Sequence, residues 1–265
     1  MLNYKLLIKQ GSILLLSLAT VFAVAKQHKL EAQEADENVT IEEVSEGEDV
    51  VVGEEVTVRG EVTEVEPGIA FTMQEEGFLS GDEVLVINVS ERTLPEGVDD
   101  LPLQVTGEVG TLVFADVETE YGLDLDPELY ADYESQTVIF ADYMVLSPEI
   151  EEVSESPENY YGIEIALQGE VDDIRNAYSF TLEEDELFEG DELLIINATG
   201  EPTPEEDEAV VVTGIVRPFI KAEFDRDYDL TWDLDVQEEI EAEYNEKPVL
   251  VVDSIYPSAE EDGLF

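Results

Sequence analysis

The strongest constraint on the fold is an internal duplication of the sequence. When residues 53–88 are placed over residues 162–197 without a gap, 14 of the 36 positions are identical. The identities are Gly53/Gly162, Glu55/Glu164, Gly60/Gly169, Glu61/Glu170, Val62/Val171, Phe71/Phe180, Thr72/Thr181, Glu75/Glu184, Gly81/Gly190, Asp82/Asp191, Glu83/Glu192, Leu85/Leu194, Ile87/Ile196 and Asn88/Asn197. A repeat of this kind predicts two copies of one structural unit, so both copies should share a fold.

The match continues with small gaps to the end of each copy. Val105-Thr106-Gly107 aligns with Val212-Thr213-Gly214, and Asp124-Leu125-Asp126 aligns with Asp233-Leu234-Asp235. The segments are then residues 1–25, a signal peptide; 26–50, an acidic disordered linker; 51–148, the first copy; 149–159, an acidic linker; 160–257, the second copy; and 258–265, a tail. We expect both linkers to be mobile, because dense like charge and low hydrophobicity do not offset the ordering entropy.

Within each copy the apolar residues alternate with a period of two, which is typical of half-buried strands. The apolar positions are Val56, Val58, Gly60 and Val62 in the first copy and Ile165, Leu167, Gly169 and Val171 in the second. A glycine on the apolar face predicts a bulge or tight bend. The runs VLVIN and LLIIN suit strands buried on both faces. The last two strands are expected near residues 103–109 and 137–146, and near 209–216 and 248–256.

One short helix is expected between the last two strands of each copy. Asp126 followed by Pro127 reads as an N-cap and a proline at the first helical position. In the second copy, Asp235 followed three residues later by Glu238 resembles a capping box. Each helix should span about 8–10 residues, close to the usual length in globular domains.

The pattern GEV…FT…GDELLIIN…VTG resembles uncharacterised exported bacterial proteins with OB-like β-barrel domains. The resemblance implies a mainly β fold with two tandem five-stranded OB-like barrels, each with one short helix. The expected helix follows strand four, whereas the usual OB order places it before that strand. A small β-sandwich is the alternative. The resemblance implies no particular activity.

The N-terminus has the pattern of an export signal. Lys5 and Lys9 precede the apolar run of residues 13–25, which ends in a small-x-small cleavage site. A membrane span needs about 20 apolar residues, so this run is short for one. We therefore expect cleavage and export to the periplasm, the cell envelope or the extracellular space. An uncleaved signal anchor is the alternative.

The charge of the chain excludes one common partner. Eleven basic and 68 acidic residues give a net charge of −57. OB barrels often bind single-stranded nucleic acid through a basic groove, and this field repels phosphates and anionic lipid. We therefore expect no nucleic acid partner, no membrane binding after signal cleavage, and a monomer. Adaptation to salt, or solubility, explains the acidity most simply, and a surface for cations or a basic partner is the alternative.

The sequence contains few of the residue types on which catalytic sites usually depend. The chain has one histidine, His28, and no cysteine, so structural zinc and nucleophilic triads lack their residues. We assign no catalytic or cofactor-binding residue. The repeated Asp-Leu-Asp offers oxygen ligands for calcium, although capping of a helix is the favoured interpretation. These candidate metal ligands are Asp124, Asp126, Asp233 and Asp235.

Two further motifs have a structural and a functional interpretation. Basic and aromatic residues in the second copy suggest a rim for an acidic or sugar-like ligand, although neutralisation of nearby acids is favoured. These candidate ligand-binding residues are Arg217, Lys221, Tyr228 and Trp232. Asn88-Val89-Ser90 and Asn197-Ala198-Thr199 match the N-glycosylation sequon, and a shared strand ending explains them equally well.

The sequence therefore predicts a non-catalytic exported binding or structural module, whose partner is a protein, a glycan or a cation. A divalent-cation-binding or salt-adaptation protein is the alternative. A hydrolase that uses carboxylates in an inter-domain cleft is a third.

Overall fold

The computed structural model describes residues 38–47, 50, 52–66, 69–75, 83–90, 102–184, 192–227 and 234–259, which form a mainly β fold. The strands are β1 (Glu55–Glu66), β2 (Ala70–Gln74), β3 (Glu83–Asn88), β4 (Pro102–Thr111), β5 (Thr137–Leu146), β6 (Glu164–Asn176), β7 (Ser179–Glu183), β8 (Glu192–Asn197), β9 (Ala209–Pro218) and β10 (Pro248–Pro257). The helices are α1 (Ile41–Glu46), α2 (Phe114–Tyr121), η1 (Ala131–Tyr133), α3 (Ile150–Glu155), η2 (Pro157–Asn159), α4 (Lys221–Asp227) and α5 (Leu234–Tyr244). The strands expected before and after the predicted helices are confirmed as β4, β5, β9 and β10.

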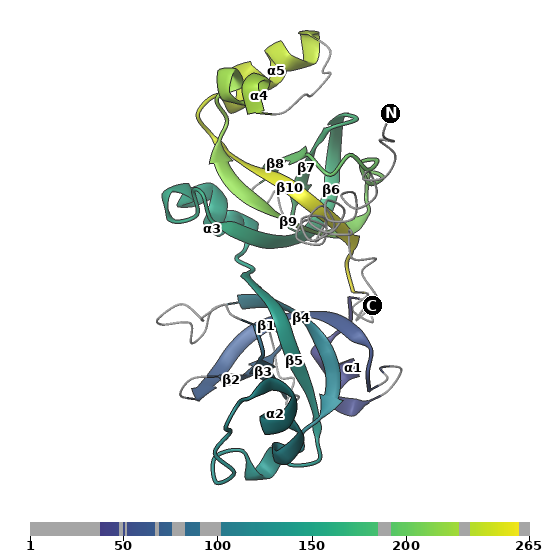
Figure 1. The fold of residues 1–265 in the computed structure, drawn as a ribbon. Helices are drawn as coiled ribbons and strands as arrows, with labels where there is room; N and C mark the ends of the chain where they lie inside the picture. The colour runs from purple at the N-terminus through teal and green to yellow at the C-terminus, as the bar shows by residue number, and fades with distance from the viewer. Residues whose placement is uncertain are drawn as a thin grey trace, which may run out of the picture. The chain divides into compact units, whose positions relative to one another are not determined.

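The first five strands close into a barrel (Figure 1). β1 pairs with both β2 and β4, β2 pairs with β3, and β4 pairs with β5, all antiparallel. β3 and β5 run parallel, with Leu85 opposite Val138, and this pairing completes the ring. Closure satisfies the edges that an open sheet would leave unpaired.

The strands of the second copy follow the same pairing scheme. β6 pairs with β7 and β9, β7 pairs with β8, and β9 pairs with β10, all antiparallel. β8 and β10 run parallel, with Leu194 opposite Val249. These two residues correspond to Leu85 and Val138 of the first copy, so the register is also repeated.

The matched glycines Gly60 and Gly169 lie where a long strand changes partners. β1 pairs with β4 up to Glu61 and with β2 from Glu61 onward. A Cβ atom at Gly60 would collide with the carbonyl oxygen of Gln74, and one at Gly169 would collide with that of Glu183. Glycine is therefore required because another backbone approaches closely, whereas the sequence predicted a bulge or tight bend at this position.

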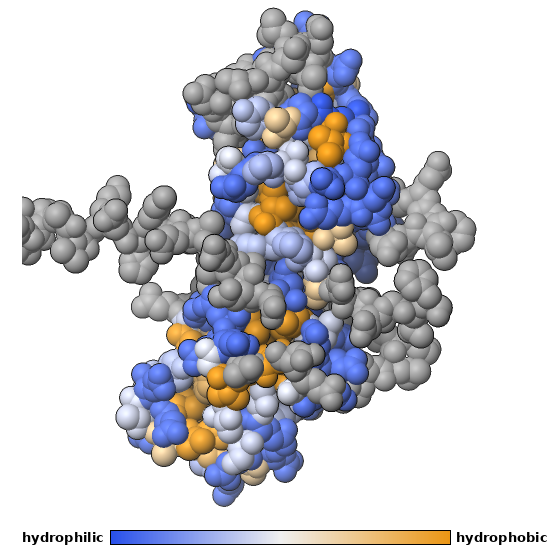
Figure 2. Space-filling model, turned by 90° about the vertical axis from the view of Figure 1, so that its right-hand side faces the viewer, coloured by the Kyte–Doolittle hydropathy of each residue, from blue (hydrophilic) through white to orange (hydrophobic). Residues whose placement is uncertain are grey.

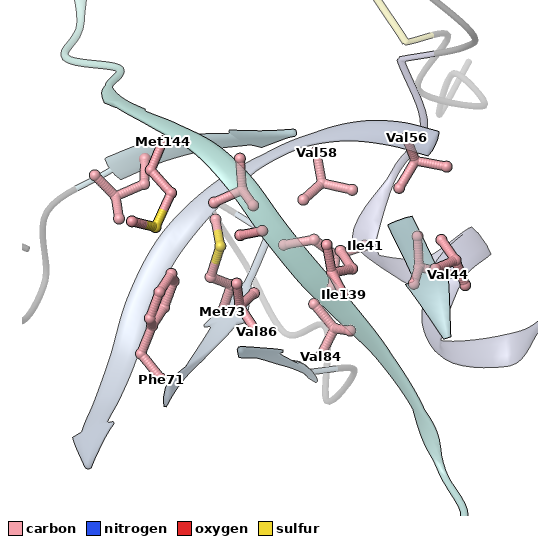
Figure 3. Packing of buried hydrophobic residues seen from close by; sticks show 14 of the residues in the cluster. Ile41, Val44, Val56, Val58, Phe71, Met73, Val84, Val86, Ile139 and Met144 are labelled. Carbon is pink, nitrogen blue, oxygen red and sulfur yellow. The ribbon is translucent and has the colours of Figure 1, made fainter. Parts of the chain in front are cut away.

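The expectation of mobile linkers is wrong for the parts of residues 26–50 and 149–159 that the structure describes. Residues 41–46 form α1 and residues 150–155 form α3. Ile41 and Val44 are fully buried, and Figure 3 shows both in the apolar cluster with Val56 and Ile139. Acidic residues occupy the outer face of each helix, so its composition resembles that of a linker although one side is part of the core.

Each of these helices is fixed at its N-terminus by a carboxylate from the end of a strand. The Glu75 side chain accepts a hydrogen bond from the backbone N–H of Glu42 at 3.2 Å. The Glu184 side chain accepts from the backbone N–H groups of Ile150 and Glu151, at 3.3 Å for the latter. Glu75 and Glu184 are one of the identical pairs of the duplication, and both satisfy helix donors that have no partner within the helix.

A second apolar layer lies outside the barrel wall. In β3, Val84 and Val86 belong to the inner cluster, whereas Leu85 and Ile87 belong to an outer one. The outer cluster joins them to residues of the segment between β4 and β5, which are Leu112, Val117, Leu125 and Tyr130. β8 has the same two-sided burial, and the segment between β9 and β10 contributes Phe219, Phe224, Ile240 and Tyr244. The prediction that these strands are buried on both faces is confirmed.

The helices between the last two strands lie differently from the prediction. In the first copy, α2 precedes Asp126, and Asp126 begins a turn that includes residues 127–129. In the second copy, two helices occupy this connection, and α5 begins at Leu234, so Asp235 is within the helix. Short capping patterns predict a helix end from local residues, whereas these connections also pack against the outer faces of β3 and β8.

Candidate functional site

The predicted calcium ligands fall into a capped turn in the first copy. Asp126 Oδ1 accepts a hydrogen bond from the backbone N–H of Glu128 at 2.9 Å, and its carbonyl accepts from those of Leu129 and Tyr130. Asp124 is exposed, while Leu125 between the two aspartates is buried in the outer cluster. Asp126 therefore has a structural role in the turn.

The other two predicted calcium ligands belong to the second copy. Asp233 lies outside the described residues, and Asp235 lies in the first turn of α5. Within the described ranges, no three Asp, Glu or His side chains are grouped so that they could hold a metal ion.

The predicted ligand rim is held by contacts within the second copy. Arg217 on β9 contacts Asp227 of α4 at 3.1 Å and Glu223 of α4 at 3.5 Å. Its guanidinium lies 5.3 Å from the centroid of the Phe224 ring, a cation–π distance. Hydrogen bonds from Arg226 and Arg217 lower the pKa of Asp227 below its usual value. Arg217 thus attaches α4 to β9.

The remaining rim residues are not brought together by the described structure. Lys221 is the first residue of α4. Tyr228 and Trp232 lie outside the described residues.

Both sequons form the same turn after a buried strand. Asn88 Oδ1 accepts hydrogen bonds from the backbone N–H of Ser90 at 3.0 Å and from its hydroxyl at 2.6 Å. Asn197 Oδ1 accepts from the same two groups of Thr199 at the same distances. Asn197 is 1% exposed, and its Nδ2 donates to the carbonyl of Glu201. The repeated Asn-x-Ser/Thr is therefore a strand-ending Asx turn, the structural alternative that the sequence left open.

A row of three glutamates crosses the second copy. Glu170 of β6 lies directly opposite Glu183 of β7, and Glu183 lies directly opposite Glu192 of β8. Residues directly opposite each other share a face of the sheet, and like charges so placed are destabilising. Burial raises the pKa of Glu183, and Asp172, Glu170 and Glu192 raise it further. Sequence reasoning missed this row because the register that creates it is a property of the folded sheet.

In the first copy, the corresponding row has a neutral residue at its centre. Its corresponding residues are Glu61, Gln74 and Glu83, again opposite each other across three strands. The neutral Gln74 occupies the place of Glu183, so adjacent carboxylates are separated. The repulsion is therefore a feature of the second copy and is not required by the fold.

The last strand of each copy contains a bulge, and an aspartate occupies it in both copies. Asp142 in β5 and Asp253 in β10 are skipped by the register, which pairs the preceding residues, Ala141 and Val252, with Gly107 and Gly214 respectively. A Cβ atom at either glycine would collide with the backbone of the bulged strand, which explains the repeated glycine of Val-Thr-Gly. Burial raises the pKa of both aspartates, and Glu164 raises that of Asp253 further.

No protein-family model matches the chain, and no curated protein matches it. Among the helices in the described part of the chain, none has the length and apolar character needed to cross a membrane.

Proposed function

We propose that this protein is a non-catalytic binding or structural module of the cell envelope or extracellular space, built from two tandem OB-like barrels. The pairing order β1-β2-β3-β5-β4, repeated by β6-β7-β8-β10-β9, supports two barrels of one kind. The identities of the duplication and the resemblance to exported OB-like domains point the same way.

One observation carries the proposal: the outer face of β3 and that of β8 are covered by the protein itself. OB barrels bind their ligands on the face of the second and third strands and in the adjoining loops, including the one between the last two strands. Here Ile87 and Ile196, which point outward from β3 and β8, are fully buried beneath those connections. A partner of this protein therefore binds another surface, and its net charge disfavours nucleic acid there as well.

Cysteine labelling tests whether these faces are covered in solution, because the chain has no cysteine of its own. Leu85→Cys and Leu194→Cys place a thiol on the outer face of each barrel, and Leu129→Cys places one at a residue that is 51% exposed. In the folded protein we expect rapid labelling of the control and protection of the other two. Rapid labelling of Leu85→Cys and Leu194→Cys with native unfolding behaviour would show open ligand faces and contradict the proposal.

Export is tested by expressing the full chain in bacteria and determining, by mass spectrometry, the molecular mass of the protein in each cell fraction. We expect a chain that begins at Lys26 in the envelope or the culture fluid, as the small-x-small site predicts. Recovery of the full-length chain in the cytoplasm would contradict it. A variant with arginines within residues 13–25 should remain inside and serves as the control.

Salt adaptation is a second candidate, and the glutamate row of β6, β7 and β8 favours it. Screening by salt weakens repulsion between exposed like charges, so the melting temperature should rise with ionic strength. We expect sodium and calcium chloride to act alike when compared at equal ionic strength. A much larger rise with calcium would instead indicate a specific divalent-cation site.

A further inference from the structure

The helices α1 and α3 have the same six-residue sequence. Residues 41–46 and residues 150–155 both read Ile-Glu-Glu-Val-Ser-Glu, at the offset of 109 that relates the two copies. The copies have diverged elsewhere, with 14 identities in the 36 positions compared above. Each helix buries only its isoleucine and its valine, which join the inner apolar cluster of its own copy. Core packing requires apolar residues of suitable size at two positions, so it does not explain why all six residues agree.

Each helix lies on a site with the same two features. The isoleucine lies over the glycine at which the long strand changes partners, so that its Cδ1 atom would be 2.5 Å from a Cβ atom at Gly60 and 3.1 Å from one at Gly169. A carboxylate just after the next strand, that of Glu75 or Glu184, accepts hydrogen bonds from the first turn of the helix. We call Gly60 with Glu75, and Gly169 with Glu184, the helix-docking sites.

The two helices also have the same backbone hydrogen bonds. The N–H of Val44 donates to the carbonyl of Thr40 at 3.3 Å, and that of Val153 donates to the carbonyl of Glu149 at 3.3 Å. Both helices therefore present an isoleucine and a valine on one face, three residues apart. Because the sequence and the backbone agree, we infer that either helix fits either docking site.

The attachment of the two helices to the strands differs. α3 lies between β5 and β6, so the chain holds it at both ends. α1 precedes β1, and the ring of β1–β5 closes through strand pairings in which α1 takes no part. A helix of six residues does not persist alone in water, where isolated helices need about 12–15 residues. α1 can therefore leave its docking site and unfold while the ring stays closed.

The departure of α1 uncovers apolar residues of the first copy. Figure 3 shows these residues around Ile41 and Val44, and they include Val84 and Val86 from the inner face of β3. The docking site is thus separate from the outer face of β3, which the connection between β4 and β5 covers. On the face drawn in Figure 2, hydrophilic residues surround separate apolar patches, so apolar exposure on that face is local. An additional apolar patch on such a surface is a site for a segment that can cover it.

We propose that the docking site of the first copy binds short helices with an isoleucine and a valine three residues apart, and that α1 is its displaceable plug. This proposal rests on the binding function proposed above and names a site for it. When α1 leaves, a partner helix of the same pattern places its isoleucine over Gly60 and its first backbone N–H groups against Glu75. Recognition of a helix through apolar residues at positions i and i+3 is a common mode of peptide binding.

The test uses the full chain and a labelled peptide of residues 38–47, which includes α1. Ile41→Ser with Val44→Ser removes the apolar face of α1 and opens the docking site, and we call this protein the open variant. Glu46→Ala, at an exposed position of α1, keeps the plug and is the matched control. Binding is measured by fluorescence anisotropy in about 0.5 M salt, which screens the repulsion between the acidic peptide and the acidic protein.

We expect the open variant to bind the peptide at least about tenfold more tightly than the wild type and Glu46→Ala, because their own α1 competes at a high effective concentration. A peptide of residues 147–156, which includes α3, should also bind the open variant. A peptide of residues 38–47 with both serine substitutions should not bind. Equal Kd values for all three proteins, equal binding of the serine peptide, or no binding by an open variant with native circular dichroism would overturn the proposal.

Hydrogen exchange of the wild type decides the question if the open variant unfolds. The amide of Val44, which donates to Thr40, should exchange at least about tenfold faster than that of Asn88, which donates to Ile69 at the end of β3. Equal protection of these two amides would show that α1 leaves only when the ring opens, and it would overturn the proposal.

Sedimentation equilibrium separates the competing occupant, the α1 helix of a second copy. We expect a wild-type monomer, and a dimer that is lost in the open variant would assign the site to chain exchange and overturn the plug. Cysteine labelling at Leu85 and Leu194 reports on the outer faces of β3 and β8 and does not involve α1. Failure of the docking site is therefore distinguishable from failure of the proposed function.

Discussion

At the scale of single residues, the two copies act as internal controls for each other. Gln74 and Glu183 occupy the same position between two glutamates on neighbouring strands. We expect Glu183→Gln to raise the free energy of unfolding by up to about 1 kcal/mol, because it removes like charges placed directly opposite each other. Urea unfolding of the full chain measures the change.

The reverse substitution provides the control for that prediction. Gln74→Glu creates the same row in the first copy and should lower the free energy of unfolding by a similar amount. Both effects should shrink in high salt, because these side chains are partly exposed. A Glu183→Gln variant that is less stable than the wild type would show that the row is compensated by contacts that glutamine cannot make.

The second prediction concerns Asn197, whose side chain uses both its acceptor and its donor. Asn197→Asp keeps the acceptor but loses the bond to the carbonyl of Glu201 at a residue that is 1% exposed. A buried group left without its partner costs about 1–3 kcal/mol, and we expect a loss of stability in this range. Asn159→Asp, at an exposed position, is the control and should change little. An unchanged melting temperature in Asn197→Asp would contradict the role of the turn.

At the scale of elements, α1 and α3 each belong to the apolar core of the copy that they precede. Ile41 and Ile150 are fully buried, so we expect Ile41→Ala and Ile150→Ala each to cost about 2–5 kcal/mol. Glu46→Ala, at an exposed position of α1, should change stability by less than about 0.5 kcal/mol. Thermal unfolding checks all three, and a chain that tolerates both isoleucine changes would show that the helices are dispensable.

The strands of this fold could be predicted from the sequence, and the short helices could not. Alternation of apolar residues from Val56 to Val62 reports a strand directly, because one face of it is buried. In α1 only Ile41 and Val44 are buried, so the helix has too few apolar residues to show a period. One signal was present: Ile-Glu-Glu-Val-Ser-Glu occurs at residues 41–46 and again at 150–155, with the same offset of 109 as the strands.

The candidate surfaces could not be predicted from the sequence, for a different reason. Arg217 was recognisable as an unusual cation in an acidic chain, but its pairing with Asp227 depends on where α4 lies. Ile215 belongs to a strand in which apolar residues are expected, and its exposure depends on how β9 pairs with its neighbours in the folded sheet. Patterns along a chain report burial on average, whereas the exposure of a single residue depends on the fold around it.

At the scale of the whole molecule, stability should fall as the pH rises. Folding raises the pKa of Glu183, Asp142 and Asp253, so the folded state holds these protons more tightly than the unfolded chain does. Their contribution is fully present below their unfolded pKa values, near 4, and is lost as the pH rises through the folded values. We expect a higher melting temperature at pH 5 than at pH 7, measured at constant ionic strength, and the opposite order would contradict these assignments.

A second loss of stability is expected in alkaline solution. Burial, with the nearby carboxylate of Glu152, raises the pKa of Tyr160 to about 12. Its contribution is present below the unfolded value of 10.0 and is lost as the pH rises towards 12. Tyr160→Phe should remove this part of the alkaline transition, and an unchanged transition in that variant would assign it to other groups.

The closed ring of β1–β5 also has a consequence for the speed of folding. It is completed by Glu55 with Glu108 and by Leu85 with Val138, residues about fifty positions apart in each case. Contacts so distant along the chain must pay loop-closure entropy before they gain any stability, which places such folds in the millisecond-to-second range. During that interval Ile41 and Val44 of α1 lack the complete apolar cluster in which they are buried. Repulsion between chains with a net charge of −57 opposes the association of these partly folded molecules until the ring of strands closes.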